Sequence, residues 1–283
     1  MKILTLNTHS LLEDRYREKL HWFVDAVVRE RPDIIALQEV NQSVSAELMD
    51  PAMLEGHYPL PGSIPIRSDN HAAHVARLLQ QAGLECYWVW MPIKLGFGKY
   101  DEGVAVLSIG RPFRSVDQIP MNRVHDYQDW RSRAALGVKV EGWEDWFYCL
   151  HMGWWNDGDH DFLSQWKILN SCIASKWICG PVWLMGDFNA PDIVSGQGYD
   201  HVVSCGWIDT HLSARHRDRG FTVAGLPGIP GAEAVGGDVP EGVRLDYIFS
   251  SRPREILSSR VMFNGTGEPV ISDHYGVLIE TAD

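Results

Sequence analysis

The stretch VWLMGDFNAP, residues 182–191, begins as an apolar strand and ends in polar residues. Gly186 allows the strand to bend, or another group to come close to its backbone. Side chains at positions i and i+2 of a strand point the same way, so Asp187 and Asn189 would face one cleft. The alternative is an ordinary turn, because Asp, Asn, Gly and Pro are the usual turn residues. The rest of the chain has to distinguish the two.

The composition is that of an ordinary globular protein. The chain has 283 residues, 45% of them hydrophobic and 22% charged, which is enough for one large domain or two smaller ones. Its formal net charge is −12. Proteins that bind nucleic acid usually present a basic face to the phosphates. Because this chain is acidic, we expect a small substrate rather than a nucleic acid.

The sequence gives no sign of a membrane or export segment. The apolar run at residues 3–6 is far too short for a signal peptide or a membrane span. No later stretch approaches about 18 uninterrupted apolar residues. The five cysteines are scattered and form no CxxC pair, which is typical of reduced thiols. These features predict a cytoplasmic protein that does not associate with membranes.

Eight short apolar runs, each bounded by turn residues, predict strands. They read KILTLN, DIIALQEV, GVAVLS, LGVKV, WFYCLHM, PVWLMGDF, RLDYIFS and YGVLIE. Apolar residues with helical spacing predict helices around residues 20–27, 72–82 and 161–177. Several runs have no helix between them, which favours two packed sheets with outer helices over a βαβ barrel. Glycines and prolines predict a loop over residues 224–243.

Polar residues that could take part in catalysis stand at or near the ends of six predicted strands. They are Asn7, Glu39, His151, Asp187 with Asn189, Asp246, and Asp273 with His274. Each alone is more often a cap, a turn residue or a structural side chain. Together they indicate a site on one rim of a rigid sheet, where sites are commonly built.

These motifs also carry a resemblance. LTLNTHS, ALQEV, EGVAVLS, LHMGWW, MGDFNA, RLDYIFSS and SDHYG, in this order, resemble the endonuclease/exonuclease/phosphatase superfamily from Asn7 to His274. The resemblance implies a single catalytic domain over residues 1–283. It implies a four-layer α/β-sandwich, in which two packed mixed β-sheets are flanked by helices. It further implies a divalent cation, Mg²⁺ or alternatively Mn²⁺, and hydrolysis of a phosphoester.

The resemblance also implies which residues hold the cation. Magnesium prefers hard oxygen ligands and keeps several waters, so one or two carboxylates suffice. Glu39 is the expected first ligand. Asn7 and Asp273 are expected beside it, directly or through water.

The remaining polar residues receive catalytic roles. Asp187 would orient or deprotonate the attacking water, and Asn189 would donate hydrogen bonds to the phosphate or to that water. Asp246 would orient His274 and favour its charged form, which can bind a phosphoryl oxygen. Whether Asp187 or His274 takes the proton stays open. His151 falls where the superfamily places a further His or Tyr on the phosphate side.

The substrate is less well specified, because the superfamily acts on DNA, phospholipids, RNA tails and phosphoinositides. Aromatic faces suit sugars and bases, so Trp154, Trp155 and Tyr100 are candidate substrate contacts, although the tryptophans could equally pack in the core. MKILTLNTHS, HMGWWND and SSRVMFNGTGEPVISDHYGV resemble the bacterial maltose 6'-phosphate phosphatase branch. This implies a phosphomonoesterase acting on a phosphorylated sugar such as maltose 6'-phosphate. The alternatives are a phosphodiesterase, either a DNA endonuclease or a sphingomyelinase-like enzyme, and a non-catalytic binding protein on the same fold.

Overall fold

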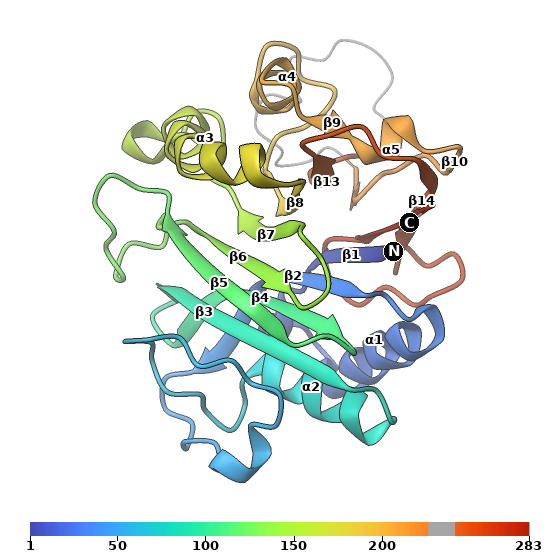
Figure 1. The fold of residues 1–283 in the computed structure, drawn as a ribbon. Coiled ribbons are helices and arrows are strands. Elements are labelled where there is room, and N and C mark those ends of the chain that lie inside the picture. Colours follow the sequence, from blue (N-terminus) through green and yellow to red (C-terminus); the bar gives the residue numbers. More distant parts are fainter. Residues whose placement is uncertain (226–240, 283) are drawn as a thin grey trace.

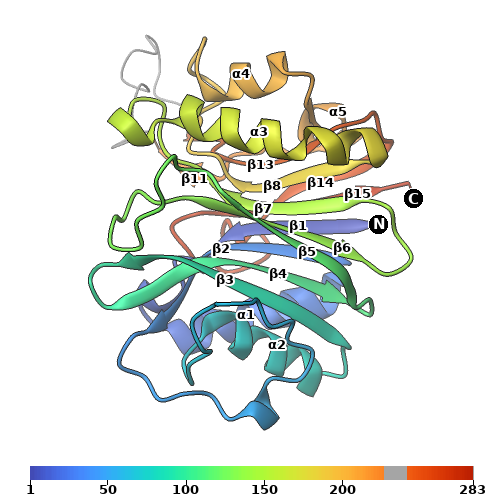
Figure 2. The ribbon, with the colours of Figure 1, turned by 60° about the vertical axis from the view of Figure 1, so that its left-hand side comes forward.

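The computed structural model describes residues 1–225 and 241–282 of the chain. Within them, two large mixed β-sheets pack face to face, and helices cover the outer face of each sheet (Figures 1 and 2). This is the four-layer α/β-sandwich that the resemblance implies. The loop predicted over residues 224–243 lies outside the described residues between 226 and 240. Its described ends take part in two short paired strands, β11 (Val223–Ala224) and β12 (Gly242–Val243).

The first sheet has the strand order β10-β14-β15-β1-β2-β4-β3. Its neighbours β1 and β2 run parallel, whereas β1 and β15, and β2 and β4, are antiparallel. The bounds are β1 (Lys2–Asn7), β2 (Ile34–Ser43), β3 (Cys86–Gly96), β4 (Tyr100–Ile109), β10 (His216–Arg217), β14 (Ile256–Met262) and β15 (Gly276–Thr281).

The second sheet has the strand order β5-β6-β7-β8-β13-β9. Strands β7 and β8 run parallel, and β13 is antiparallel to β8. The bounds are β5 (Phe113–Pro120), β6 (Ala134–Val140), β7 (Trp146–His151), β8 (Val182–Asp187), β9 (Ile208–Asp209) and β13 (Asp246–Ser250).

Residues of the central strands alternate between the inner core and the outer helices. Ile3 and Ile34 of the first sheet join Phe147 and Trp183 of the second in the apolar core between the sheets. Leu4, the neighbour of Ile3, belongs instead to the core beneath the helices. Because both faces of these strands are buried, their sequences are nearly continuous apolar runs.

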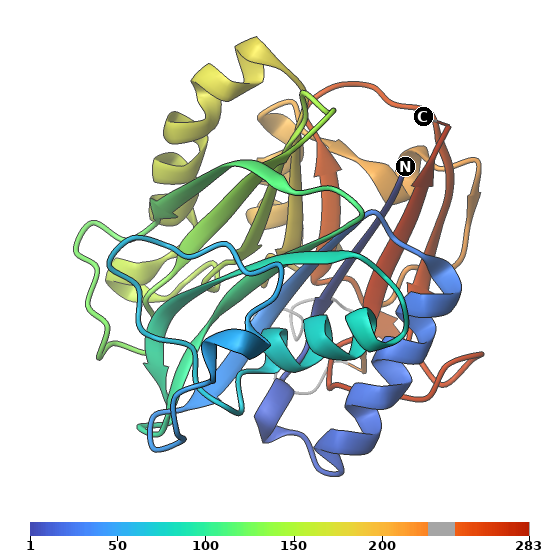
Figure 3. The ribbon, with the colours of Figure 1, turned by 60° about the horizontal axis from the view of Figure 1, so that its bottom comes forward.

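The helices form the two outer layers. Figure 3 shows α1 and α2 across the outer face of the first sheet, and Figure 2 shows α3 and α4 over the second. Helices α2 and α3 are capped at their N-termini by Asn70 and Asp161, whose side chains accept hydrogen bonds from the backbone N–H groups of Ala73 and Ser164 at 3.0 and 2.7 Å. The bounds are α1 (Tyr16–Glu30), α2 (His71–Gln81), α3 (Phe162–Cys179), α4 (Gly198–Ser204) and α5 (Thr210–Ser213), with 3₁₀ turns η1 (Ser10–Leu12), η2 (Pro51–Met53) and η3 (Gly158–His160).

The eight predicted strands and three predicted helices are all present, with shifted ends. Strands β3, β5 and β14 are not predicted, and neither are the two-residue strands β9, β10, β11 and β12. β3 and β5 each stand at one edge of their sheet, and β14 lies next to the edge strand β10. Most side chains of β5 are at least partly exposed, so its sequence shows little apolar alternation. Most of β3 is buried, but its apolar run CYWVWM is interrupted by Pro92, a residue that argues against a strand interior.

The five cysteines are free thiols, as their scatter predicts. None of the helices in residues 1–225 and 241–282 has the length and hydrophobicity of a membrane-spanning segment.

Strand pairing brings the polar strand ends to one rim of the sandwich. In the first sheet, Asn7 at the end of β1 stands beside Gln38 of β2. In the second, His151 at the end of β7 pairs with Asp187 at the end of β8, and Asp187 pairs with Asp246 at the start of β13. The rim predicted from the sequence is therefore formed by both sheets.

Candidate active site

A cavity of about 710 Å³ lies at this rim. The predicted site residues that line it are Glu39, His151, Trp154, Asp187, Asn189 and His274. Asn7 and Asp246 are buried and hydrogen-bonded to members of this set. The structure therefore brings most of the predicted catalytic residues together.

The GDFN stretch forms a turn and also supplies two groups of the cavity. Asp187 ends β8, and its Oδ1 accepts a hydrogen bond from the backbone N–H of Asn189 at 2.8 Å. Asn189 has a φ of +47°, in the left-handed region that Asn tolerates better than most residues. Gly186 has a φ of +145°, and a Cβ there would lie 2.0 Å from the carbonyl oxygen of Leu150. The two interpretations of this stretch are therefore both correct, because the residues that form the turn also line the cavity.

A β-bulge in β2 turns Glu39 into the cavity. The register between β2 and β4 shifts between Leu37 and Val40, so two residues of β2 stand opposite one of β4. Glu39 has a φ of +52°. Its neighbour Gln38 points between the sheets, where its amide lies 3.1 Å from the thiol of Cys149. Such backbone conformations persist where the surrounding structure holds them, which is common at functional sites.

Asn7 connects the two carboxylates of the cavity. Its Nδ2 donates to Oε1 of Glu39 at 2.9 Å and to Oδ2 of Asp187 at 3.1 Å. Its Oδ1 accepts the backbone N–H of His9 at 3.2 Å. In this orientation the carboxamide positions both carboxylates and turns its oxygen, the atom that would bind a metal directly, away from Glu39.

His274 is held between two carboxylates. Its Nδ1 lies 2.9 Å from Oδ2 of Asp246, and its Nε2 lies 3.8 Å from Oδ2 of Asp187. Burial works against the charged imidazole. The charges of Asp246 and Asp187 outweigh burial and raise the pKa of His274 well above its usual value. His274 is therefore a cation at neutral pH.

The surroundings of Asp187 favour its neutral form, whereas those of His274 favour its charged form. Burial, only partly offset by the charge of His274, raises the pKa of Asp187 to about 7. A carboxyl group that titrates near neutral pH can take a proton from water and later release it. The electrostatics therefore favour Asp187 as the base and His274 as the cation.

His151 lies on the other side of Asp187. Its Nε2 is 3.5 Å from Oδ2 of Asp187 and 3.2 Å from Nδ2 of Asn189. Burial, with the nearby charges of Arg133 and Lys94, lowers the pKa of His151 well below its usual value. His151 is therefore a neutral hydrogen-bonding group rather than a second cation.

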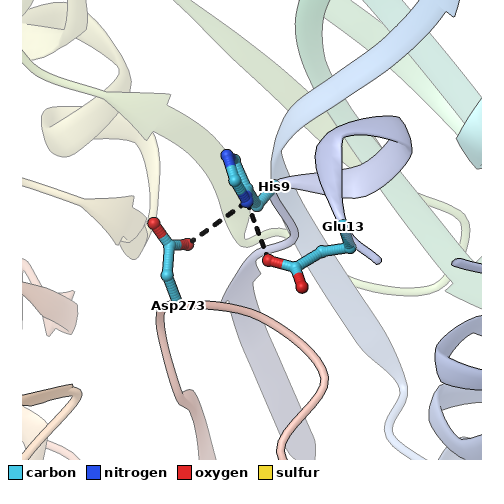
Figure 4. Close-up of side chains that lie close together, drawn as sticks. All are labelled: His9, Glu13 and Asp273. Carbon is cyan, nitrogen blue, oxygen red and sulfur yellow. Dashed lines mark hydrogen bonds and ion pairs between the residues drawn. The ribbon is translucent and has the colours of Figure 1, made fainter. Parts of the chain in front are cut away.

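Asp273 lies outside the cavity lining, in a cluster with His9 and Glu13 (Figure 4). Nδ1 of His9 is 2.7 Å from Oε1 of Glu13 and 4.0 Å from Oδ1 of Asp273. The side chain of Asp273 is 63% exposed, so a carboxylate oxygen is free to take a further partner. The charges of Asp273 and Glu39 both bear on the pKa of His9, so the cluster stands close to the metal ligand predicted first.

The donor chemistry of this region fits a divalent cation. Burial and the charge of Glu102 raise the pKa of Glu39, and a bound cation would relieve that cost. Among the described residues, the groups His9, Glu13, Asp273 and Asp187, Asp246, His274 each bring ligand atoms within 4.8 Å of one another. In the second group, Oδ1 of Asp246 is buried and has no hydrogen-bond partner within residues 1–225 and 241–282. Glu39 and Asp273 are hard oxygen donors of the kind that magnesium prefers.

Five charged or aromatic residues of the cavity lining are not predicted from the sequence. Lys94, Glu102 and Arg133 are buried charged residues in the lining, and Phe97 and Trp130 are aromatic residues at the opening. Phe97 is 70% and Trp130 60% exposed. The sequence does carry a signal for the loop that holds Phe97, since glycines between two apolar runs indicate a turn.

Two of the three predicted aromatic contacts lie outside the cavity. Trp155 is half-buried and packs on Phe162, with ring centroids 6.0 Å apart, against the core beneath α3. Tyr100 begins β4, and its ring lies 4.8 Å from Nζ of Lys99. Trp154 does line the cavity. The aromatic residues of the lining are thus Phe97, Trp130 and Trp154.

Comparison with known protein families agrees with this geometry. The profile of the Endonuclease/Exonuclease/phosphatase family matches residues 4–274. The chain belongs to the endonuclease/exonuclease/phosphatase family. Members of this family are generally metal-dependent hydrolases. No curated protein shows a significant sequence match to the chain.

Solved structures of the endonuclease/exonuclease/phosphatase family share the fold. A family protein from Leptotrichia buccalis is 29% identical, with a TM-score of 0.82 over 100% of both chains. A mannosyl-6-phosphatase from Bacteroides thetaiotaomicron is 16% identical, with a TM-score of 0.65 over 100% of both chains. A 3'-5' exonuclease from Neisseria meningitidis is 18% identical, with a TM-score of 0.61 over 99% of both chains. At such identities the last two support the fold and leave the substrate of this chain open.

Proposed function

We propose that this protein is a Mg²⁺-dependent phosphomonoesterase that acts on a phosphorylated sugar such as maltose 6'-phosphate. The observation that carries the proposal is that charged and aromatic residues line one cavity. Glu39, Asp187 and His274 are among the charged residues, and Phe97, Trp130 and Trp154 are the aromatic ones. A phosphate group suits His274 and a cation bound by the carboxylates, and the apolar face of a sugar ring suits the aromatic side chains.

Size and charge support a small substrate. A volume of about 710 Å³ lies within the usual range of small-molecule pockets. A nucleic-acid duplex would need a basic track several phosphates long, which the net charge of −12 disfavours. We therefore propose a sugar phosphate as the partner rather than a nucleic acid.

The charged residues divide the work of hydrolysis. Asp187, once deprotonated, accepts a proton from the attacking water. His274 donates from Nε2 to a phosphoryl oxygen, because its Nδ1 is already held by Asp246. Asn7 keeps Asp187 in place through the 3.1 Å hydrogen bond. A divalent cation held by Glu39 and Asp273 would supply Lewis-acid polarisation of the phosphoryl group.

Hydrolysis assays matched to each ester test the proposal, with phosphate release for sugar phosphates, strand cleavage for DNA and phosphocholine release for sphingomyelin. The panel comprises maltose 6'-phosphate, mannose 6-phosphate, nicked and abasic DNA duplexes, and sphingomyelin, each with Mg²⁺, with Mn²⁺ and with a chelator. We expect the highest kcat/KM for a sugar phosphate, and we expect no turnover of any substrate in chelator. A higher kcat/KM for a duplex or for sphingomyelin overturns the sugar phosphatase. If no ester is turned over, and the chain still binds sugar phosphate, the fold serves for binding.

A further inference from the structure

Arg133 is a buried cation whose donors are incompletely used. It immediately precedes β6, and only 5% of its surface is exposed. Its Nη1 donates to the carbonyl oxygens of Trp130 at 3.0 Å and Ser132 at 3.2 Å. Its Nε is buried and has no hydrogen-bond partner among the described residues. An unused donor on a buried charge is costly, and such a group calls for a ligand.

The neighbouring cation is already neutralised. Nζ of Lys94 lies 2.9 Å from Oε1 of Glu102, and both side chains are buried in the cavity lining. Within residues 1–225 and 241–282, no carboxylate lies within ion-pair distance of Arg133. Of the two cations, Arg133 is therefore the one whose charge remains available to a ligand.

The position of Arg133 points to the reacting phosphate. It lines the same cavity as Glu39, Asp187 and His274. Burial lowers the pKa of Arg133, and the charges of Glu102, Asp187 and Glu39 work against it, so these groups are neighbours of the guanidinium. A phosphate held by His274 would thus lie within the field of the guanidinium. The planar guanidinium fork also matches the geometry of phosphate oxygens.

Charge then distinguishes two substrate classes. A phosphomonoester carries nearly two negative charges at pH 7, because its second pKa is about 6, whereas a phosphodiester carries one. An additional buried cation favours the dianion over the monoanion. A diester also has a second substituent in the place of the oxygen that the guanidinium would bind.

We propose that Arg133, beside the Lys94–Glu102 pair, forms an anion subsite that binds the non-bridging oxygens of the substrate phosphate and selects phosphomonoesters over phosphodiesters. The inference rests on the proposed phosphatase function and adds to it the group that sets the class of ester. Glu102 is a positioning residue in this scheme, because it fixes and neutralises Lys94.

The test compares p-nitrophenyl phosphate with methyl p-nitrophenyl phosphate, which share a leaving group and differ in phosphate charge. Arg133→Met should lower kcat/KM for the monoester by about 10²-fold, typical for loss of a group that stabilises transition-state charge, and lower it much less for the diester. Arg123→Met is the matched control, because Arg123 is exposed on the same segment before β6. The control should leave both values unchanged.

Arg133→Lys is a second variant in case Arg133→Met does not fold. It keeps the positive charge and removes the planar guanidinium. We expect it to lower the monoester to diester ratio by about tenfold. If Arg133→Met does not fold, Arg133→Lys decides alone. An unchanged ratio in the folded variants overturns the subsite and shows that Arg133 only offsets the charges of Glu39 and Asp187.

A binding readout separates this inference from the proposed function. In chelator, inorganic phosphate should raise the Tm of the wild-type protein and raise that of Arg133→Met much less. If the wild-type protein hydrolyses no monoester, the phosphatase is wrong, and this titration still decides the anion subsite. If it hydrolyses monoesters while phosphate stabilises both proteins equally, the subsite is wrong and the phosphatase stands.

Discussion

Nε2 of His274 lies 3.8 Å from Oδ2 of Asp187. Each residue alters the protonation of the other, because the anion favours the imidazolium and the imidazolium favours the anion. Burial raises the pKa of Asp187 to about 7 although the charge of His274 lowers it, and the pKa of His274 stays well above its usual value. The pair can therefore combine a base and a cation over a pH range that begins near neutrality.

We expect Asp246→Asn to shift the alkaline limb of the kcat profile to lower pH. The charge of Asp246 does the most to raise the pKa of His274, so its removal lowers that pKa, and the imidazolium is lost at lower pH. At neutral pH kcat should fall by about 10²-fold, a typical loss for a disturbed acid–base group. A full pH–rate profile of the variant measures both effects.

Tyr148→Phe is the control. Tyr148 belongs to the same sheet as Asp246 and lies outside the cavity lining, and its hydroxyl donates a hydrogen bond to Asp117 at 2.8 Å. Its pH profile should match that of the wild-type protein. An Asp246→Asn enzyme with lower kcat and an unmoved alkaline limb would show that Asp246 does not act through the protonation of His274.

Glu39→Gln should remove most of the activity, and high Mg²⁺ should restore part of it. The substitution keeps the shape of the side chain and removes the charge that makes Glu39 a magnesium ligand. The measurement is kcat/KM as a function of Mg²⁺ concentration, with chelated wild-type enzyme as the reference. Undiminished turnover of the wild-type protein in excess chelator contradicts a metal-dependent reaction.

The central strands and their polar ends could be predicted because burial on both faces produces continuous apolar runs. The rim geometry follows from strand pairing, which places His151 beside Asp187 and Asp187 beside Asp246. The bulge at Glu39 could not be predicted, since a single extra residue in a register has no periodic signal.

Long-range contacts explain what the sequence concealed. Arg133 and Lys94 are ordinary basic residues in the sequence, and only tertiary packing buries them in one cavity. The same holds for the aromatic residues. Trp154 and Trp155 are adjacent, yet Trp154 lines the cavity and Trp155 packs against the core beneath α3. Side-chain direction after a strand ends does not follow a simple alternation.

Asp187→Asn should stabilise the chelated protein at pH 8. The pKa of Asp187 is raised in the fold from 3.8 to about 7, so the folded state holds the proton more tightly than the unfolded chain. Stability from this group is therefore lost as pH rises from about 4 to about 7. At 1.36 kcal/mol per pKa unit, Asn should raise the free energy of unfolding by up to roughly 4 kcal/mol at pH 8.

Urea unfolding at pH 5 and pH 8 measures this gain. At pH 5 Asp187 is protonated in the fold but ionised in the unfolded chain, so the gain should fall to roughly 1.6 kcal/mol. Asp25→Asn, at an exposed position of α1, should show no gain at either pH. An equal gain at both pH values would mean that the ionisation of Asp187 is not its source.

Trp130→Ala should raise KM for a sugar phosphate and leave KM for methyl phosphate unchanged. Trp130 is 60% exposed at the cavity opening and is free to stack on an apolar sugar face, whereas methyl phosphate does not reach it. By analogy with base stacking on an aromatic side chain, the expected cost is roughly 1–3 kcal/mol. Val124→Ala, on the same segment and outside the cavity lining, serves as the control. If KM rises equally for both substrates, Trp130 supports the charged residues of the cavity, and the leaving group is held elsewhere.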